Sequence, residues 1–280
     1  SGAICGVLQF RQQWVSFTGA PQTIAVGADM RLSGAPIGLG LSVISDKIGP
    51  MSTTFARVAG SYLIPNLAGG TLGLGLDVGI LQKSINSNWV VPEPGKIDPT
   101  IPGTYGDALS NPALGKATYD LGFGAFYQIP GRFYAGLSST HLPAQTVGSG
   151  AIKYDMTRHY YVMSGYIFPI NPNNEIGVNV KYKSDLAAGA FDANLIYSYL
   201  VTPAQKISLG ATYRVNDAAA VLLGYQMPYR NYTFKLGYSY DFTLSKIKGY
   251  SSGTHELILG VCFTPQIKKI SSYGDDRFLN

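Results

Sequence analysis

The chain has 280 residues and a formal net charge of +5, with 46% hydrophobic and only 13% charged residues. No apolar run approaches the roughly 18–20 residues that a membrane-spanning helix needs. The Lys and Arg residues are scattered and form no basic stripe with stacking aromatics, so nucleic-acid binding is not expected. Glycine (34) and tyrosine (20) are abundant, and the apolar residues lie in short alternating segments, a pattern typical of a transmembrane β-barrel. A soluble β-sandwich is the alternative that composition leaves open.

Period-two alternation predicts fourteen antiparallel strands, although about 12–16 would be compatible with the weak signal that each barrel strand gives. Segment 71–83 alternates leucines and other apolar residues with glycines and Asp77, whereas segment 158–168 is ambiguous because both of its faces carry aromatics. The predicted strands are 3–11, 22–32, 37–46, 53–63, 71–83, 118–128, 132–140, 158–168, 175–183, 191–200, 206–214, 219–227, 232–242 and 254–263.

The two faces of these strands differ in a way that favours a barrel over a sandwich. Large apolar residues continue along one face of every strand, and tyrosines gather at strand ends, as in the aromatic girdles of membrane barrels. Because hydrocarbon leaves no backbone group solvated, such a sheet must close on itself. The other face carries small residues and charges of both signs, which we expect to pair in a narrow lumen: Arg11, Asp29, Arg57, Asp77, Lys181, Arg214 and Lys235.

The connections give independent support for the strand count. Every second connection is short and contains proline, which favours turns and cannot continue a central strand. The connections between them are mostly longer, and segment 84–117 is the longest. Short turns on one rim and long loops on the other match the periplasmic and extracellular ends of an outer-membrane barrel. We therefore predict a barrel over residues 1–265 and a polar periplasmic tail over residues 266–280.

Two cysteines, Cys5 and Cys262, fall in the first and last predicted strands, which meet where the barrel closes. Alternation places both in the lumen near the periplasmic rim. A disulfide there is conceivable because the periplasm is oxidising. Direct cross-strand geometry is often unfavourable for a disulfide, so the favoured interpretation is two small buried thiols.

The three histidines do not indicate a metal-binding or catalytic site. His141, His159 and His255 lie beside predicted extracellular loops, and no two of them have the spacing of metal ligands. No Ser/His/Asp constellation is evident. The glycine-rich run 73–79 lacks the spacing and the following helix of a nucleotide-binding loop. No catalytic residue, metal or cofactor is predicted.

The extracellular rim is the better candidate for a binding surface. The loop 245–252 is basic and contains Gly and Ser, and exposed aromatics with Lys or Arg suit protein recognition, although solvated loops explain many such residues individually. The predicted partner-binding residues are Trp14, Asp46, Lys47, Trp89, Tyr105, His141, Lys246, Lys248 and Tyr250.

Several segments resemble one known family. The run 38–50 (GLGLSVISDKIGP) resembles a "GLGLS…NDKIGP" segment of the PorP/SprF family of Bacteroidota outer-membrane proteins. Segments 133–142, 159–166 and 223–226 also match, and the longest match is 236–256. The resemblance covers nearly the whole chain, although the family's usual opening, an Asn-Pro-Ala-Tyr-Ala-Gly-like stretch, is not present here.

The resemblance implies a non-enzymatic barrel of the type IX secretion system. Such proteins help to secrete large adhesins with a type B C-terminal domain, including gliding-motility adhesins, and hold them at the cell surface. One member is implicated in a link to a periplasmic peptidoglycan-associated protein, and an accessory lipoprotein is a further expected partner. Two other hypotheses remain open from the residues alone: a transporter or channel for small solutes, and an outer-membrane hydrolase.

Overall fold

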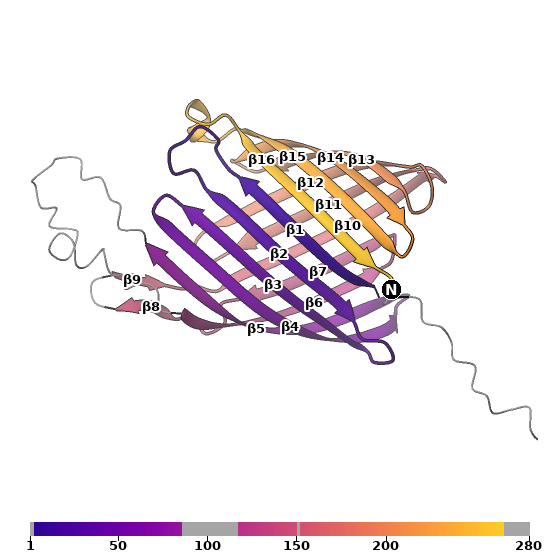
Figure 1. The fold of residues 1–280 in the computed structure, drawn as a ribbon, viewed down its shortest axis with the longest axis horizontal. Helices are drawn as coiled ribbons and strands as arrows, with labels where there is room; N and C mark the ends of the chain where they lie inside the picture. Colours follow the sequence, from indigo (N-terminus) through magenta and orange to yellow (C-terminus); the bar gives the residue numbers. More distant parts are fainter. Residues whose placement is uncertain (1–2, 86–116, 150–151, 266–280) are drawn as a thin grey trace, which may run out of the picture.

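The computed structural model describes residues 3–85, 117–149 and 152–265. Fourteen strands close into one antiparallel barrel, and each strand pairs with its neighbours in sequence (Figure 1). The barrel strands are β1 (Ile4–Gln12), β2 (Gln22–Arg31), β3 (Ile37–Ile48), β4 (Met51–Leu67), β5 (Gly70–Ile85), β6 (Ala117–Ile129), β7 (Phe133–Thr140), β10 (His159–Asn171), β11 (Asn174–Ser184), β12 (Gly189–Leu200), β13 (Lys206–Arg214), β14 (Ala218–Tyr229), β15 (Tyr232–Thr243) and β16 (Thr254–Phe263). The predicted strand count is confirmed.

The predicted boundaries differ mainly where prolines end strands. Strand β4 continues past Pro65 to Leu67, and the ladder between β4 and β5 shifts register between Ile64 and Leu67. Strand β10 continues through Pro169, where the ladder shifts again. Proline has no N–H to donate to a ladder, so it is accommodated in an irregular strand end rather than excluded from the strand. The prolines therefore mark the correct rim, but the turns themselves are tighter than predicted.

The loop between β7 and β10 contains structure that alternation did not reveal. Strands β8 (Thr146–Ser149) and β9 (Ile152–Asp155) pair with each other in a separate two-stranded sheet that extends beyond the barrel wall (Figure 1). A 3₁₀ helix, η1 (Lys246–Gly249), lies in the loop between β15 and β16. No helix in the described part of the chain is long and apolar enough to cross a membrane.

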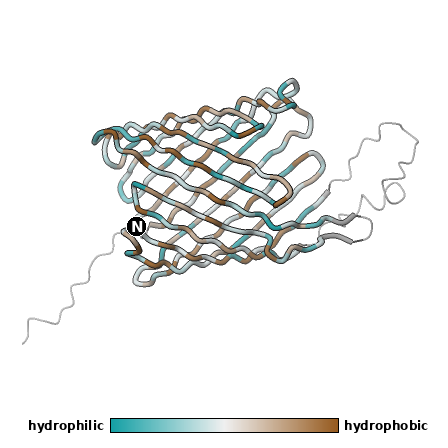
Figure 2. The backbone as a smooth tube through the Cα atoms, turned by 180° about the vertical axis from the view of Figure 1, so that it is seen from behind, coloured by the Kyte–Doolittle hydropathy of each residue, from teal (hydrophilic) through white to brown (hydrophobic). Residues whose placement is uncertain are grey.

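Hydrophobic and hydrophilic residues alternate along the strands (Figure 2), so apolar side chains lie on one face of the barrel wall and small or polar ones on the other. On β5, the outward side chains Leu76, Val78 and Ile80 are more than half exposed, as expected for residues that contact lipid. The tyrosines predicted for the girdles also point outward, and Tyr62 and Tyr213 are 58% and 52% exposed. The ambiguous strand β10 is resolved by its register, which places His159 opposite Thr140 and Tyr161 opposite Ser138 on the inner face.

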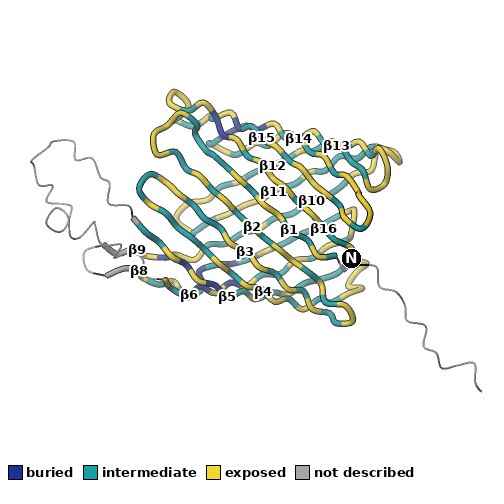
Figure 3. Tube along the Cα trace, in the orientation of Figure 1, coloured by how far each residue is buried: buried dark blue, intermediate teal, exposed yellow. Residues whose placement is uncertain are grey.

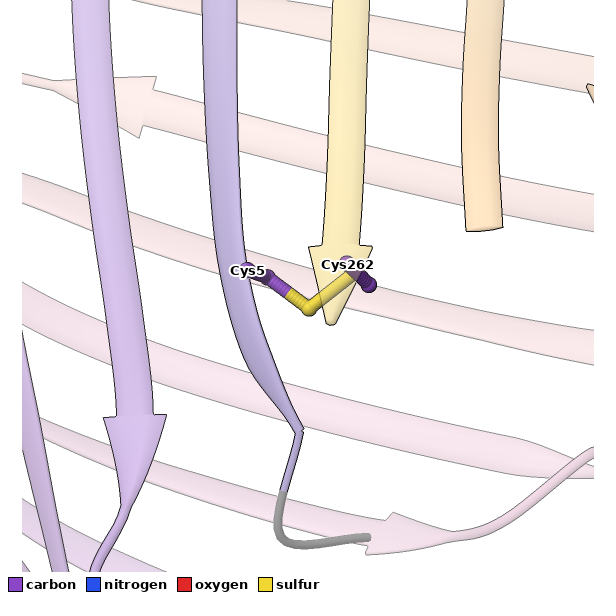
Figure 4. Close-up of a disulfide and its surroundings, with 2 residues drawn as sticks. All are labelled: Cys5 and Cys262. Carbon is purple, nitrogen blue, oxygen red and sulfur yellow. A yellow bond between two sulfur atoms is a disulfide. The ribbon is translucent and has the colours of Figure 1, made fainter. Parts of the chain in front are cut away.

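The barrel closes between β1 and β16, and a disulfide fastens this seam. Cys5 pairs directly with Cys262 in the ladder, with a Cα–Cα distance of 4.0 Å, and their sulfurs are bonded (Figure 4). The favoured interpretation of two separate thiols is therefore wrong. Both side chains point into the lumen, and the direct cross-strand register brings them close enough to bond.

Candidate functional site

The inner wall carries two ionic clusters in its extracellular half. The first joins β1, β13, β15 and β16. Arg11 donates to Asp241 at 3.0 Å and to Glu256 at 2.6 Å, and Arg214 also pairs with Asp241. The Asp241 side chain is only 1% exposed, so two guanidinium groups neutralise one buried carboxylate. The expected pairing of opposite charges in the lumen is confirmed here.

The second cluster joins β4, β5 and β6 to the loop after β7. Arg57 donates to Asp120 at 2.6 Å and lies 3.8 Å from Asp77. The Nδ1 atom of His141 lies 3.0 Å from Asp120 but is not oriented for a hydrogen bond, so this buried nitrogen has no hydrogen-bond partner. Both clusters coincide with the buried stretches on β5 and β6 and near β15 in Figure 3.

A row of hydrogen-bonded side chains crosses the inner face from β7 to β13. Tyr134 donates to Asn179 at 3.0 Å, Asn179 to Asn194 at 3.0 Å, and Asn194 to Thr212 at 2.7 Å. Asn179, Asn194 and Thr212 lie directly opposite one another on β11, β12 and β13. Tyr134 on β7 reaches Asn179 across Gly165 of the intervening strand β10. Polar side chains that satisfy one another in this way hold the wall in one arrangement.

The extracellular rim is a connected layer of loops. The Val15 N–H donates to the Gly253 carbonyl at 2.9 Å, and the Ser252 N–H donates back to Val15 at 2.8 Å. The Leu244 N–H donates to Asp217 at 2.8 Å. The β1–β2, β13–β14 and β15–β16 loops are thereby joined, because backbone hydrogen bonds cross from each loop to the next.

The joined loops and the strand ends beside them carry exposed apolar and basic side chains, which together we call the rim patch. Its residues are Phe17, Val215, Leu244, Lys246, Lys248 and Tyr250, all of which are exposed. Tyr250 is 74% exposed, more than any other described aromatic residue. Exposed apolar side chains rimmed by charges are typical of protein-binding surfaces. Sequence reasoning identified the two lysines and Tyr250 but missed Phe17, Val215 and Leu244, because the loop contacts that join them are not visible in alternation.

The other predicted rim residues differ in their exposure and in their position on the barrel. Trp14 lies in the β1–β2 loop, where its backbone N–H donates to the Thr254 hydroxyl oxygen. Lys47 is exposed at the end of β3, whereas Asp46 points inward and accepts from Thr23. His141 is 6% exposed, and it belongs to the second ionic cluster rather than to a docking surface. Trp89 and Tyr105 lie outside the described residues, as do most of loop 84–117 and the predicted tail 266–280.

The described residues include no group of three or more His, Cys, Asp or Glu side chains that could hold a metal ion. Each carboxylate in the ionic clusters lies within 4 Å of an arginine side chain, and Asp77 and Asp120 share Arg57.

Comparison with known proteins assigns the chain to a family. The family model for the type IX secretion system membrane protein PorP/SprF matches residues 2–261. This chain belongs to the PorP/SprF family. It is an outer-membrane barrel of the type IX secretion system, as the sequence resemblance implied.

Solved structures agree on the fold of this PorP/SprF protein. The TodX deltaS2 mutant, a monoaromatic hydrocarbon channel, aligns with a TM-score of 0.51 at 11% identity, over 94% of this chain and 89% of TodX. A Pseudomonas aeruginosa FadL homologue aligns with a TM-score of 0.50 at 9% identity, over 93% of this chain and 89% of that one. At such identities the likeness concerns the barrel fold alone. No curated protein matches the chain.

Proposed function

We propose that this barrel is a non-enzymatic component of the type IX secretion system that helps to secrete an adhesin with a type B C-terminal domain and then anchors it at the cell surface. The observation that carries the proposal is the family match over residues 2–261. The rim patch supplies a surface of suitable chemistry for the adhesin.

Two features of the rim patch suit a stable protein partner. The patch combines two aromatic side chains, two aliphatic side chains and two lysines, and exposed tyrosines such as Tyr250 are enriched in binding hot spots. Its loops are held to one another by backbone hydrogen bonds, so less conformational entropy is lost when a partner binds.

Partners on the periplasmic side are part of the same proposal. Membership of the family implies contact with other type IX secretion components. A periplasmic peptidoglycan-associated protein or a lipoprotein would approach the short turns, where β1 begins and β16 ends. The two rims would then serve different partners, with the adhesin outside and the secretion machinery inside.

Affinity purification of the tagged barrel in mild detergent tests the proposal. We expect a large secreted surface protein to co-elute with the wild type. We also expect a triple variant of the patch, Lys246→Glu, Lys248→Glu and Tyr250→Ala, to lose that protein but retain the periplasmic components. Failure of any surface protein to co-elute, together with open-pore currents in planar bilayers, would favour the small-solute transporter instead.

A further inference from the structure

A cavity of about 620 Å³ lies along the inner wall formed by β2 to β7 and β10. Its periplasmic end is lined by Arg31, Thr71 and Gln128, at the ends of their strands, and its lining reaches Asp77 on the extracellular side. The volume is in the range of small-molecule sites. The cavity therefore extends from the periplasmic rim to the second ionic cluster.

Glycines create this space. Inward-facing Gly40, Gly75 and Gly124 line the cavity where larger side chains would fill it. A Cβ atom at Gly75 would lie no closer than 3.5 Å to any atom, and one at Gly40 no closer than 3.7 Å, so larger residues would fit the backbone at both positions. The packing of the wall does not require these glycines. Leu63, Phe126 and Met163 supply apolar surface around the space.

The charges around the cavity do not cancel. Asp29 and Arg31 at the periplasmic end carry opposite charges, and Arg57 and Asp120 form a close pair at 2.6 Å. His141, in the loop beyond β7, adds no charge at neutral pH, because burial lowers its pKa even though Asp120 opposes this effect. One arginine, Arg57, therefore faces two carboxylates, Asp77 and Asp120, and the extracellular end of the cavity carries a net negative charge.

Asp77 is also incompletely satisfied. Its Oδ1 atom is buried without a hydrogen-bond partner, and Arg57 Nε is 3.8 Å away, beyond hydrogen-bonding distance. A carboxylate with one desolvated and unpaired oxygen is destabilised, so an ammonium group that reaches the exposed part of this carboxylate would stabilise its charge. The Asp77 side chain is 21% exposed, which leaves part of the carboxylate accessible from the cavity.

We propose that this cavity is a binding site for a small amphiphilic amine, whose ammonium group pairs with Asp77 and whose apolar body packs against Leu63, Phe126 and Met163. The ligand enters from the periplasmic end. The site is separate from the rim patch, so it does not depend on the proposed docking of an adhesin.

Calorimetric titration of the barrel in lipid nanodiscs tests the site, with octylamine as the probe, 1-octanol as its uncharged match and empty nanodiscs as the blank. We expect saturable binding of octylamine in excess of the blank. Asp77→Asn should weaken octylamine binding by about tenfold, because the charge-assisted bond is lost, and should leave 1-octanol binding unchanged. Equal octylamine affinity in the wild type and Asp77→Asn would overturn the assignment of the ammonium to Asp77.

Filling the cavity gives a second readout. Gly75→Leu should abolish saturable binding of both probes, and Gly40→Leu serves the same purpose if Gly75→Leu does not fold. Gly6→Leu is the matched control, because Gly6 lies on the outward face of β1 opposite Val261, outside the cavity lining, and a Cβ atom there would lie no closer than 3.8 Å to any atom. Undiminished octylamine binding in a folded cavity-filling variant would place the probe elsewhere and contradict the proposal.

Discussion

Asp241 is shared by two arginines from strands that are far apart in the sequence. Arg11 on β1 and Arg214 on β13 both pair with its carboxylate, which is almost fully buried. Removing one partner from a buried ionic group leaves the others desolvated and uncompensated, which costs far more than breaking an exposed pair. The Lys181–Asp192 pair at 3.0 Å offers a comparison on the same inner surface, because Lys181 is 47% exposed.

Asp241→Ala should therefore lower the free energy of unfolding by about 3–5 kcal/mol. Asp192→Ala should lower it by about 1 kcal/mol or less, since solvent screens the exposed lysine. Urea titration in bilayers, followed by the electrophoretic shift between folded and unfolded barrel, measures both. Equal effects of the two substitutions would show that burial does not govern these pairs.

His141 makes a distinct prediction about pH. Its surroundings are Asp120, Arg57 and His159, and burial is the largest influence, so the pKa of His141 lies below its ordinary value of 6.5. Below pH 6.5 the unfolded chain binds a proton at this residue before the folded barrel does. The stability that depends on neutral His141 is therefore present above this pH and is lost as pH falls through the folded pKa.

We expect the urea midpoint to decline between pH 7.5 and pH 5 more steeply in the wild type than in His141→Gln, which cannot take up the proton. The difference between the two slopes isolates this residue from the other titrating groups. An identical decline in both proteins would mean that His141 is protonated equally in the folded and unfolded states.

At the scale of the elements, strands were predictable because lipid imposes one alternating pattern on the whole wall. Leucine and glycine alternate so regularly over 71–83 that β5 could be assigned from sequence, together with the inward position of Asp77. The β8–β9 sheet was missed because it lies outside the wall, where no such pattern applies. His141 was misjudged as a surface residue because its burial arises from contacts with β4 and β6, which local sequence does not encode.

The disulfide at the seam between β1 and β16 could be predicted from the sequence only in part. Sequence placed Cys5 and Cys262 in neighbouring strands, but bonding depends on their register, and a shift of one residue would turn one cysteine toward lipid. The disulfide acts with the Arg11–Glu256 ion pair, so the β1–β16 ladder is fastened near its periplasmic end and near its extracellular end.

A Cys5→Ser/Cys262→Ser double variant should form the barrel but unfold more easily, by roughly 2–4 kcal/mol, because the disulfide closes a long loop in the unfolded chain. Reduction of the wild type should reproduce this loss of stability. The unfolded wild type should migrate differently in gels with and without reductant, whereas the unfolded double variant should not. If reduction leaves the urea midpoint unchanged, the disulfide contributes nothing to the closed seam.

At the scale of the whole molecule, the barrel separates two environments and presents different chemistry to each. Connected loops with the rim patch lie on the extracellular side, while the glycine-lined cavity reaches the periplasmic end. The composition of the rim patch could be anticipated in part from the basic loop 245–252. Its apolar members could not, because they belong to loops that are distant in sequence and are joined by backbone hydrogen bonds only in the folded barrel.

Site-specific photo-crosslinking in living cells tests the central claim most directly. A crosslinker at Tyr250 on the extracellular rim should capture a secreted adhesin, whereas one at Arg230, in the short turn between β14 and β15, should capture only periplasmic or membrane proteins. Both positions are exposed, so accessibility alone does not separate them. Capture of the adhesin from Arg230 and not from Tyr250 would contradict docking on the extracellular rim.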